Sequence, residues 1–560
     1  MQKSHVEKIQ AQLKTILKDR NADAIVVTSF DRYLNEYVPL EDCHRHDITG
    51  FKGSVADSIL PLDGKARLFV DGRYHEQADQ QCFLDLVDVE KCPYGVSNFQ
   101  ALKDFIKESG FKKIAIEGER LGVGPWRELQ EICEVEVLTS KDLEQVEFGR
   151  PPVMGEMKLV PDNLCGETAS AKIQRLCNPG VGLFVTTLDS VSWLSNTRGY
   201  QLPFQSTSRA QAFATHMKLN IIPDTDAKVS DDVKKNFNVI NDLSDVDISN
   251  IRKVIFYPSV TTVADYQTLQ SFNLELEERE GSLALEHAKK NPVEIQVMEN
   301  SFDLGDQAIF KTLNWLKDTV IERKVTEQEF NDQTSLNYNE VGAVSQSFRT
   351  ISGFGANSSI MHYGTPSKEK VWQEGEFALL DSGAFFAGGL ATDTTRTILP
   401  MGTTSAKHKE VYTLVLKGLL NAQNAVFPEG TRGQAIDALA RAPMRRHGLD
   451  FAHGTGHGVG VNVHEAGYSI TPISQVPLHA GRVGSIEPGI YIPGFGGVRL
   501  ENIVQVEKHP RYAGMLYFKP LVWIGFELEL IEKTLLNQEE IQWFMEYEAE
   551  CQKRGRSFRP

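Results

Sequence analysis

The sequence lacks any long hydrophobic run. No apolar stretch reaches the roughly 18 uninterrupted residues that a membrane-spanning helix needs. The first twenty residues, MQKSHVEKIQAQLKTILKDR, read as an amphipathic helix and lack the apolar core of a secretory signal. We therefore expect no transmembrane helix and a cytoplasmic location.

Cysteine is sparse as well. The seven cysteines are scattered along the chain, odd in number, and include no C-x-x-C pair. A secreted domain stapled by disulfides would show a denser, regularly spaced set. The pattern predicts reduced, mostly structural thiols, which agrees with a cytoplasmic protein.

Positive charge is in deficit. Lysine and arginine number 59 against 75 aspartates and glutamates, so the formal net charge is −16. Nucleic acids and anionic membranes both attract basic surfaces, so neither is expected as the main partner. The single basic cluster, KRGRSFRP at 553–560, is predicted to be a frayed tail.

A weak internal sequence repeat indicates two copies of one domain. AIVVTSFDRYLNEY, beginning at Ala24, and GLFVTTLDSVSWLSNTRGY, beginning at Gly182, each read as an apolar strand, a Thr, an Asp and an aromatic–Leu pair. Asp31 and Asp189, which this alignment equates, lie 158 residues apart, too far for a short-period solenoid. Helical segments alternate with short Val/Ile-rich strands in both copies, which predicts an α/β fold for each.

We place three domains at 1–150, 151–289 and 290–560. Two prolines in GRPPV at 149–153 exclude regular structure there and predict a linker. Asn291-Pro292 predicts the start of a helix at the second boundary. The third domain is predicted to be α+β, with helices outside a sheet whose strands carry acidic and histidine residues.

Two aspartates belong to a predicted hairpin in FALLDSGAFFAGGLATDTTRTI. An apolar strand delivers Asp381, AFFAGG supplies the turn, and a Thr-rich strand carries Asp393. Two Asp side chains on adjacent antiparallel strands can lie about 5 Å apart on one face. Without a cation that approach costs repulsion, so the pair suggests a metal. Two solvated carboxylates at hairpin ends remain the alternative for this segment alone.

Three histidines fall within twelve residues of HGTGHGVGVNVHE. His453, His457 and His464 stand in a Gly-rich stretch in which a helix is disfavoured. A loop that feeds a strand, VGVNVHE, is the predicted structure, and it would present the histidines from extended backbone. Any one of them could be a hydrogen-bonded core histidine.

Two glutamates complete the set. Glu487 in SIEPGIY ends a predicted strand, and Glu501 in VRLENIV lies on the same strand face as Arg499. Alone, Glu501 would pass for a solvated carboxylate partnered by Arg396 or Arg499. Together the four carboxylates and one imidazole match what two divalent cations need when they share bridging ligands. Such oxygen-rich donors suit Mn²⁺, Co²⁺ or Fe²⁺ better than a structural zinc ion.

These segments resemble the signature of the pita-bread metallopeptidases, and specifically of the three-domain aminopeptidase P (Xaa-Pro aminopeptidase) family. TISGFGANSSIMHYG, VFPEGTRGQAIDALAR, GLDFAHGTGHGVG and TLLNQEEIQWFMEYE are similar to that family too. DGRYHEQADQQC and LDSVSWLSNTRG resemble segments of its two N-terminal domains. The resemblance implies an α+β pita-bread catalytic domain preceded by two related creatinase-N-like α/β domains.

The resemblance also implies a role for each site residue. Asp381 would chelate one metal, Asp393 and Glu501 would bridge both, and His457 and Glu487 would complete the other. The nucleophile would be a water or hydroxide between the metals, with Glu487 as its proton acceptor. His362 and His464 would bond the scissile carbonyl and steady the tetrahedral intermediate. His453 would line the proline pocket; His362 also counts as substrate-binding. The reaction would release the N-terminal residue from peptides whose second residue is proline.

Two departures from the family pattern stand out. Eleven residues separate Asp381 from Asp393, one more than is usual in the family. An extra residue would reverse the facing of Asp393 unless the turn or a bulge absorbs it, and we expect the Gly-rich turn to do so. The spacing from His457 to His464 is also two residues shorter than in typical three-domain members, which bears on the shape of the proline pocket.

Two alternatives to the aminopeptidase stay open. A prolidase would share all five ligands and cleave only Xaa-Pro dipeptides, and a catalytically inactive pita-bread domain would serve as a binding module. By resemblance we expect two divalent cations per chain, Mn²⁺ first, with Co²⁺, Zn²⁺ or Fe²⁺ as alternatives, and a homodimer. The expected partners are peptides with proline as the second residue, not nucleic acid or membrane.

Overall fold

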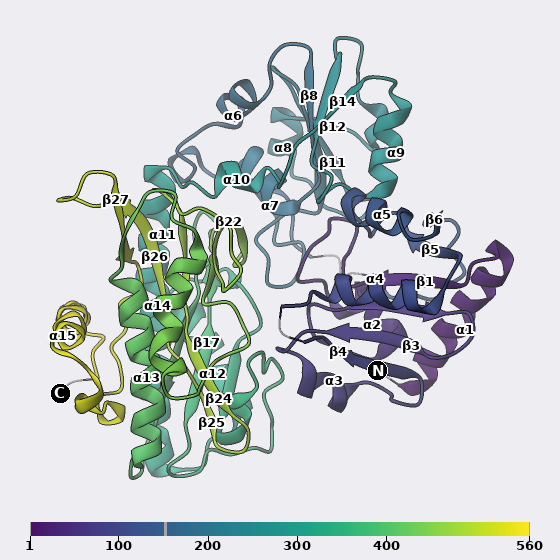
Figure 1. Ribbon diagram of the computed structural model, residues 1–560. Coiled ribbons are helices and arrows are strands. Elements are labelled where there is room, and N and C mark those ends of the chain that lie inside the picture. Colours follow the sequence, from purple (N-terminus) through teal and green to yellow (C-terminus); the bar gives the residue numbers. More distant parts are fainter. Residues whose placement is uncertain (1, 94, 151–153, 559–560) are drawn as a thin grey trace. The chain divides into compact units, whose positions relative to one another are not determined.

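The computed structural model describes residues 2–93, 95–150 and 154–558, and Figure 1 shows their helices and strands. These residues form two compact units. The first comprises residues up to Leu159, Glu167–Pro203 and Thr207–Leu283; the second comprises Val160–Gly166, Phe204–Ser206 and the chain from Ala284 onward. Part of the predicted linker, 151–153, lies outside the described residues.

The first unit contains two six-stranded sheets of the same topology. The first sheet has the order β4-β3-β2-β1-β5-β6 and the second the order β12-β11-β10-β8-β13-β14. The first sheet consists of β1 (Ala24–Thr28), β2 (Asp57–Pro61), β3 (Ala66–Val70), β4 (Val87–Lys91), β5 (Lys113–Glu117) and β6 (Glu134–Leu138). The second consists of β8 (Val181–Val185), β10 (Ala210–Ala214), β11 (Leu219–Pro223), β12 (Asn238–Val239), β13 (Lys253–Phe256) and β14 (Glu275–Glu278). The two repeated segments form β1 and β8, which occupy the same position in their sheets. This confirms that the first unit contains two copies of one domain.

Strand β1 shows why these apolar runs become central strands. Ala24 and Val26 face one hydrophobic core, and Ile25 and Val27 face the other. Both faces of the strand are therefore buried, so the sequence has no polar alternation there. Helix α1 (Lys3–Arg20), predicted from its periodicity, packs its apolar side into one of these cores. The remaining helices of this copy are α2 (His44–Thr49), α3 (His75–Gln81), α4 (Asn98–Ser109) and α5 (Val123–Gln130).

The second copy is completed by its own short helices. These are α6 (Ala169–Leu176), α7 (Leu188–Leu194), α8 (Asp231–Asn236) and α9 (Val263–Ser271), and a short ladder joins β7 (Lys158–Leu159) to β9 (Thr197–Arg198). The two copies touch through equivalent turns. Val123, at the start of α5, donates to the Thr261 carbonyl, and Val263, at the start of α9, donates to the Leu121 carbonyl.

The second unit, the catalytic unit below, is α+β as predicted. Its two main sheets have the orders β16-β17-β19 and β20-β27-β26-β23-β21-β22. Their strands are β16 (Ile351–Phe354), β17 (Ala378–Ser382), β19 (Thr394–Ile398), β20 (Val426–Pro428), β21 (Gly456–Gly458), β22 (Glu465–Ile470), β23 (Val483–Ile486), β26 (Asn502–Lys508) and β27 (Met515–Pro520). Shorter ladders pair β15 (Ser345–Gln346) with β18 (Ala384–Phe385), and β24 (Gly489–Ile492) with β25 (Gly496–Arg499).

Helices cover these sheets from outside. They are α10 (Ala284–His287), α11 (Pro292–Glu322), α12 (Glu327–Glu340), α13 (Ala406–Gln423), α14 (Gly433–Arg445) and α15 (Gln538–Lys553). Asn291 caps α11 and Asn537 caps α15, each in a capping box with a glutamate three residues on. The start of α11 at Asn291-Pro292 was predicted. Of the described helices, none is long and apolar enough to cross a bilayer.

The predicted strand VGVNVHE is wrong. Residues 460–464 form bends, residue 459 is irregular, and β22 begins only at Glu465. Two close approaches explain the loop. A Cβ atom at Gly458 would lie 2.3 Å from the Glu465 carbonyl oxygen, and one at Gly460 would meet the Glu465 carboxylate. The chain therefore folds tightly back on Glu465, which an extended strand could not do.

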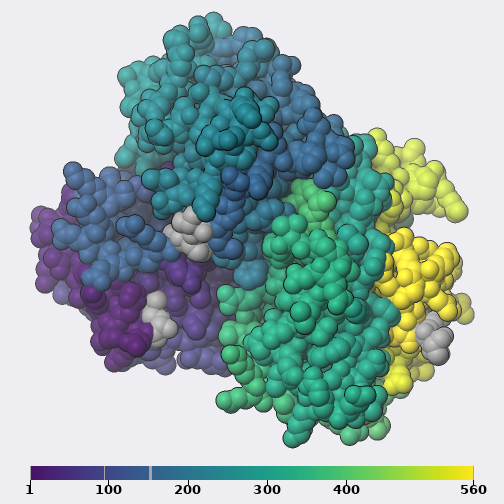
Figure 2. Space-filling model, turned by 180° about the vertical axis from the view of Figure 1, so that it is seen from behind, coloured from purple at the N-terminus to yellow at the C-terminus, as the bar shows by residue number. Residues whose placement is uncertain are grey.

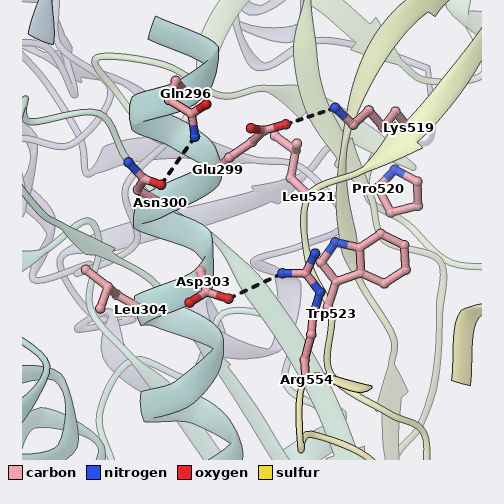
Figure 3. A pocket seen from close by; sticks show the side chains of 10 residues that line it. All are labelled: Gln296, Glu299, Asn300, Asp303, Leu304, Lys519, Pro520, Leu521, Trp523 and Arg554. Carbon is pink, nitrogen blue, oxygen red and sulfur yellow. Dashed lines mark hydrogen bonds and ion pairs between the residues drawn. The ribbon is translucent and has the colours of Figure 1, made fainter. Parts of the chain in front are cut away.

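The frayed C-terminal tail is also wrong for the described residues up to 558. Arg556 is buried and donates to Asp303 of α11 over 2.7 Å, and the Phe558 ring lies 5.1 Å from that of Phe310. In Figure 2 the C-terminal segment, in yellow, lies against the surface of this unit. Figure 3 shows Arg554 reaching Asp303 beside Trp523, at the edge of a cavity of about 660 Å³. The arginines hold the tail in place because α11 presents carboxylates to them.

Candidate metal centre

The hairpin of β17 and β19 places the two aspartates on one face. Ser382 pairs with Thr394, and three residues farther along both strands Phe385 pairs with Ala391. The register is therefore unbroken between these pairs, and the additional residue lies in the tip at 386–390. The tip contains two glycines in the left-handed region, Gly388 and Gly389. The prediction that the Gly-rich turn absorbs the extra residue is confirmed.

His457 extends from β21 toward two carboxylates. Its Nε2 lies 3.4 Å from an oxygen of Asp393 and 3.4 Å from an oxygen of Glu487. Its Nδ1 lies 3.1 Å from the Gly458 carbonyl, to which it can donate a hydrogen bond. That bond favours the tautomer whose Nε2 lone pair points at the carboxylates, as a metal ligand requires.

Glu501 enters the site between β25 and β26. Ligand atoms of Asp393, His457 and Glu501 all lie within 4.8 Å of one another. Thr395 donates to one Glu501 oxygen over 2.8 Å, while the Glu501 amide donates to the Thr395 carbonyl over 3.1 Å. The backbone and side chain of β19 thus hold Glu501 in line with the hairpin aspartates.

Three carboxylate oxygens at this point are buried without a hydrogen-bond partner. They are Asp381 Oδ1, Asp393 Oδ1 and Glu501 Oε1. A buried acceptor without a donor costs roughly 1–3 kcal/mol, more when it is charged. Two of them belong to Asp393 and Glu501, whose ligand atoms lie with that of His457 within 4.8 Å of one another, and together these groups form the donor set of a cation site. The residues present therefore fit the divalent metals that the sequence predicts.

The pKa values of the carboxyl groups in the metal-free protein agree with a cation site. Burial, together with the carboxylates of Asp381 and Glu487, raises the pKa of Asp393 well above its ordinary value. Burial and the same neighbours, with Asp393, raise the pKa of Glu501 well above its ordinary value. Burial also raises the pKa of Glu487. Acidic groups crowded in this way are strained until a cation neutralises them.

Arg499 is a site residue that our reading of the sequence missed. Its side chain is buried and donates through Nη2 to Asp381 Oδ2 over 2.5 Å and through Nε to Thr395 Oγ1 over 3.2 Å. Since Thr395 in turn donates to Glu501, one guanidinium orients two of the predicted ligands. The signal was available, because Arg499 stands two residues before Glu501 and the sequence predicted both on one strand face.

Arg499 also reaches the predicted proline-pocket histidine through Tyr491. Arg499 Nη1 donates to Tyr491 Oη over 2.7 Å, and Tyr491 Oη lies 2.8 Å from His453 Nε2. Burial and the nearby Arg499 guanidinium lower the pKa of His453 well below its ordinary value, so the ring is neutral at pH 7. Its Nδ1 donates to the Gly454 carbonyl, and its Nε2 therefore accepts the tyrosine proton.

We expect Tyr491→Phe to lower kcat/KM for a proline-containing peptide by about two- to tenfold, the equivalent of one hydrogen bond. The substitution frees the His453 ring from its anchor and leaves the five predicted ligands in place, so the metal content is expected to stay unchanged. Steady-state kinetics and metal analysis measure both. Tyr517→Phe on β27, which removes the hydroxyl that donates to Glu507, is the matched control. Equal kcat/KM in both variants would contradict this role for Tyr491.

The remaining predicted residues, His362 and His464, lie close to this centre. The His464 ring centroid is 4.2 Å from that of His457. Burial is the main cause of the low pKa of His453, and His362 lies near enough for its charge to contribute to it. Both His362 and His464 are half-buried, which leaves them open to a ligand. The structure therefore brings together all eight residues that the sequence singled out.

Sequence families match the chain in three consecutive parts. Residues 296–508 match the family described as Metallopeptidase family M24. Residues 10–146 and 149–294 each match a Creatinase/Prolidase N-terminal domain. The fold and the acidic centre thus define the class: an M24 metallopeptidase of three domains.

Full-length relatives define the family more narrowly. A Coccidioides posadasii protein named "Probable Xaa-Pro aminopeptidase P" is 32% identical, with 98% of this chain and 96% of the relative covered. An Aspergillus niger protein of the same name is 30% identical, with 98% and 95% covered. The X-prolyl aminopeptidase of Caenorhabditis elegans, described as a cytosolic enzyme with a di-nuclear active site, superposes with a TM-score of 0.88 at 26% identity, over 98% of this chain and 96% of that one. The chain belongs to the Xaa-Pro aminopeptidase (aminopeptidase P) family.

Proposed function

We propose that this metallopeptidase releases the N-terminal residue from peptides whose second residue is proline. The observation that carries the proposal is the cluster of Asp393, His457 and Glu501, together with buried oxygens of Asp381, Asp393 and Glu501 that have no hydrogen-bond partner. A site of this kind fits a pair of divalent cations, and the names of the full-length relatives support the substrate class.

Each ligand has a proposed place. Asp381 would hold one cation, Asp393 and Glu501 would bridge both, and His457 and Glu487 would complete the second. When bound, the two cations would lower the pKa of a water molecule toward neutrality and so supply the nucleophile. Mn²⁺ is the proposed metal because four carboxylates and one imidazole are mostly hard oxygen donors.

The chain's own groups would handle the proton and the carbonyl. Glu487 is the proposed proton acceptor: burial raises its pKa toward the range of a useful base, and Ser485 donates to its Oε1 over 3.2 Å. His362 and His464 are proposed to donate to the scissile carbonyl oxygen as negative charge develops on it. His453, held neutral by its surroundings, is proposed to line the pocket for the proline ring.

Domain boundaries, location and oligomeric state are proposed as well. Domain boundaries at 150/151 and 289/290 are supported by family matches that meet near 147–149 and 295. A cytoplasmic location is supported by seven free cysteines, six of them buried, and by the cytosolic neighbour. The homodimer rests on the family resemblance alone, and sedimentation velocity tests it.

A peptide series tests the substrate proposal. We expect turnover of Xaa-Pro-Pro and of longer peptides up to about nine residues, with Mn²⁺ added back after chelation. Xaa-Ala-Pro, identical except at the second residue, serves as the control and should be cut far more slowly. Cleavage of the Xaa-Pro dipeptide alone would identify a prolidase instead. Absence of metal binding in repleted protein would identify an inactive binding module.

A further inference from the structure

The segment that carries His362 has little regular structure of its own. After β16 the chain makes one short 3₁₀ turn at Gly355–Ser359 and a turn at 361–362, and it then runs without regular structure through Gly364 and Pro366. The backbone bonds next to His362 are local: Tyr363 donates to the Ile360 carbonyl, and Gly364 donates to that of His362. Short-range turns of this kind cannot by themselves hold an imidazole within the fraction of an ångström that catalysis needs.

A buried carboxylate from another element binds this segment. Glu327 is the first residue of α12, and its side chain is fully buried. Oε1 accepts from the Phe354 amide over 2.9 Å and from Asn357 Nδ2 over 3.0 Å. Oε2 accepts from Tyr363 Oη over 2.8 Å and from the Ser367 amide over 3.1 Å.

These four bonds fall on both sides of His362. Phe354 and Asn357 precede it, and Tyr363 and Ser367 follow it. The start of α12 is tied to the same segment by backbone as well, because Gln328 donates to the Ser367 carbonyl. One carboxylate therefore closes the loop around the histidine.

The chemistry of the contact requires a carboxylate. All four partners are donors: two backbone amides, a side-chain amide and a phenol. An ionised carboxylate offers acceptor sites only, so it can satisfy all four. Burial together with the Glu327 charge raises the pKa of Tyr363, so its hydroxyl remains a donor at neutral pH. The positive end of α12 also favours negative charge at the first helical residue.

We propose that Glu327 is a positioning residue of the catalytic centre: its carboxylate clamps the 354–367 segment and so fixes His362 at the scissile carbonyl. The inference depends on the role proposed above for His362. Glu327 touches no substrate and no reacting atom; it acts through the histidine.

Glu327→Gln tests the clamp because it keeps the shape and replaces one acceptor oxygen with an amide donor that faces other donors. We expect kcat to fall about ten- to a hundredfold, the size of effect that a misplaced catalytic group produces, with KM changed by less than about threefold. Metal content per chain is expected to stay at that of the unsubstituted protein. A purely structural role would lower the melting temperature without this split between kcat and KM.

The control is Glu540→Gln on α15. Glu540 is equally buried and accepts from a backbone amide, that of Asn537, and from Lys417 and Asn421. We expect this variant to lose stability and to keep its kcat. A drop in kcat as large as that of Glu327→Gln would show that any lost buried carboxylate impairs the enzyme, and it would overturn the proposal.

A double-mutant cycle with His362→Ala decides whether the effect passes through the histidine. Once the imidazole is gone, Glu327→Gln should lower the residual kcat by less than about twofold. Losses that multiply, or a folded and metal-loaded Glu327→Gln enzyme with unchanged kcat, would overturn the proposal. Unchanged kcat in His362→Ala alone would instead refute the role of His362, while cleavage of Xaa-Pro-Pro by the unsubstituted enzyme tests the proposed function separately.

Tyr363→Phe keeps the test decisive if Glu327→Gln does not fold. It removes one of the four donors from a half-buried side chain and leaves the carboxylate in place. We expect a two- to tenfold fall in kcat, equivalent to one hydrogen bond, and the same loss of effect in the His362→Ala background.

Discussion

Glu501→Ala is expected to lower kcat by about a thousandfold or more, since it removes the ligand proposed to bridge both cations and, with it, the activated nucleophile. Glu501 is 1% exposed, and its ligand oxygen lies within 4.8 Å of ligand atoms of both Asp393 and His457. No other described carboxylate in the cluster can take its place, because Thr395 and Arg499 hold the backbone and side chains around it in fixed positions.

Metal analysis and kinetics on Xaa-Pro-Pro measure this together. We expect the metal content to fall from about two equivalents to one or none. The control is Glu507→Ala on β26, the strand that begins directly after Glu501; Glu507 pairs with Lys519 and Tyr517. A Glu501→Ala enzyme that keeps both its activity and its metal would refute the bridging role.

Removal of the metals is expected to reverse the pH dependence of stability. In the metal-free fold the pKa values of Asp393, Glu501 and Glu487 are raised above their ordinary values, mainly by burial. A carboxyl group whose pKa is higher in the folded state contributes stability below its ordinary pKa, and that stability is lost as pH rises through the raised value. The metal-free protein should therefore become more stable from about pH 8 down to about pH 5.

The metal-loaded protein should behave in the opposite way, since cations bind the deprotonated ligands and are released as the pH falls. At pH 8, with metal about a thousandfold above its dissociation constant, binding contributes about 4 kcal/mol to the free energy of unfolding. For a unit of this size that corresponds to roughly 10 °C in the melting temperature of the catalytic unit. The difference should shrink toward pH 5.

Melting curves with Mn²⁺ and after chelation, recorded from pH 5 to pH 8, test this prediction. The first unit serves as an internal control, because its transition should not respond to metal. A difference in melting temperature between the metal-loaded and metal-free forms that stays constant across this pH range would show that the carboxylates do not titrate as the buried cluster requires.

Much of the fold could be predicted because its signals are local. The apolar runs at β1 and β8, the Asn-Pro start of α11 and the glycines of the 386–390 tip all act through neighbouring residues. The loop at 459–464 could not be predicted in this way. Its path is set by the contact of Gly458 and Gly460 with Glu465, a residue whose carboxylate is held by His287 and Lys290, far away in the sequence.

The prediction of a frayed C-terminal tail was wrong for a similar reason. Arginines near a chain end are usually solvated, and nothing local shows that α11, some 250 residues earlier, presents Asp303 to Arg554 and Arg556. Ion pairs across such distances exist only after the helices have packed.

The sequence by itself indicated the candidate groups: five proposed metal ligands and three further histidines, singled out by their residue types and by the resemblance of their segments to a known family. Only the tertiary structure decided how those groups are held. Arg499 between Asp381 and Thr395, Tyr491 on His453, and Glu327 around His362 are hydrogen bonds between residues distant in the chain. The chemical group that a position offers depends on one residue, whereas the partner that this group meets depends on how the fold packs.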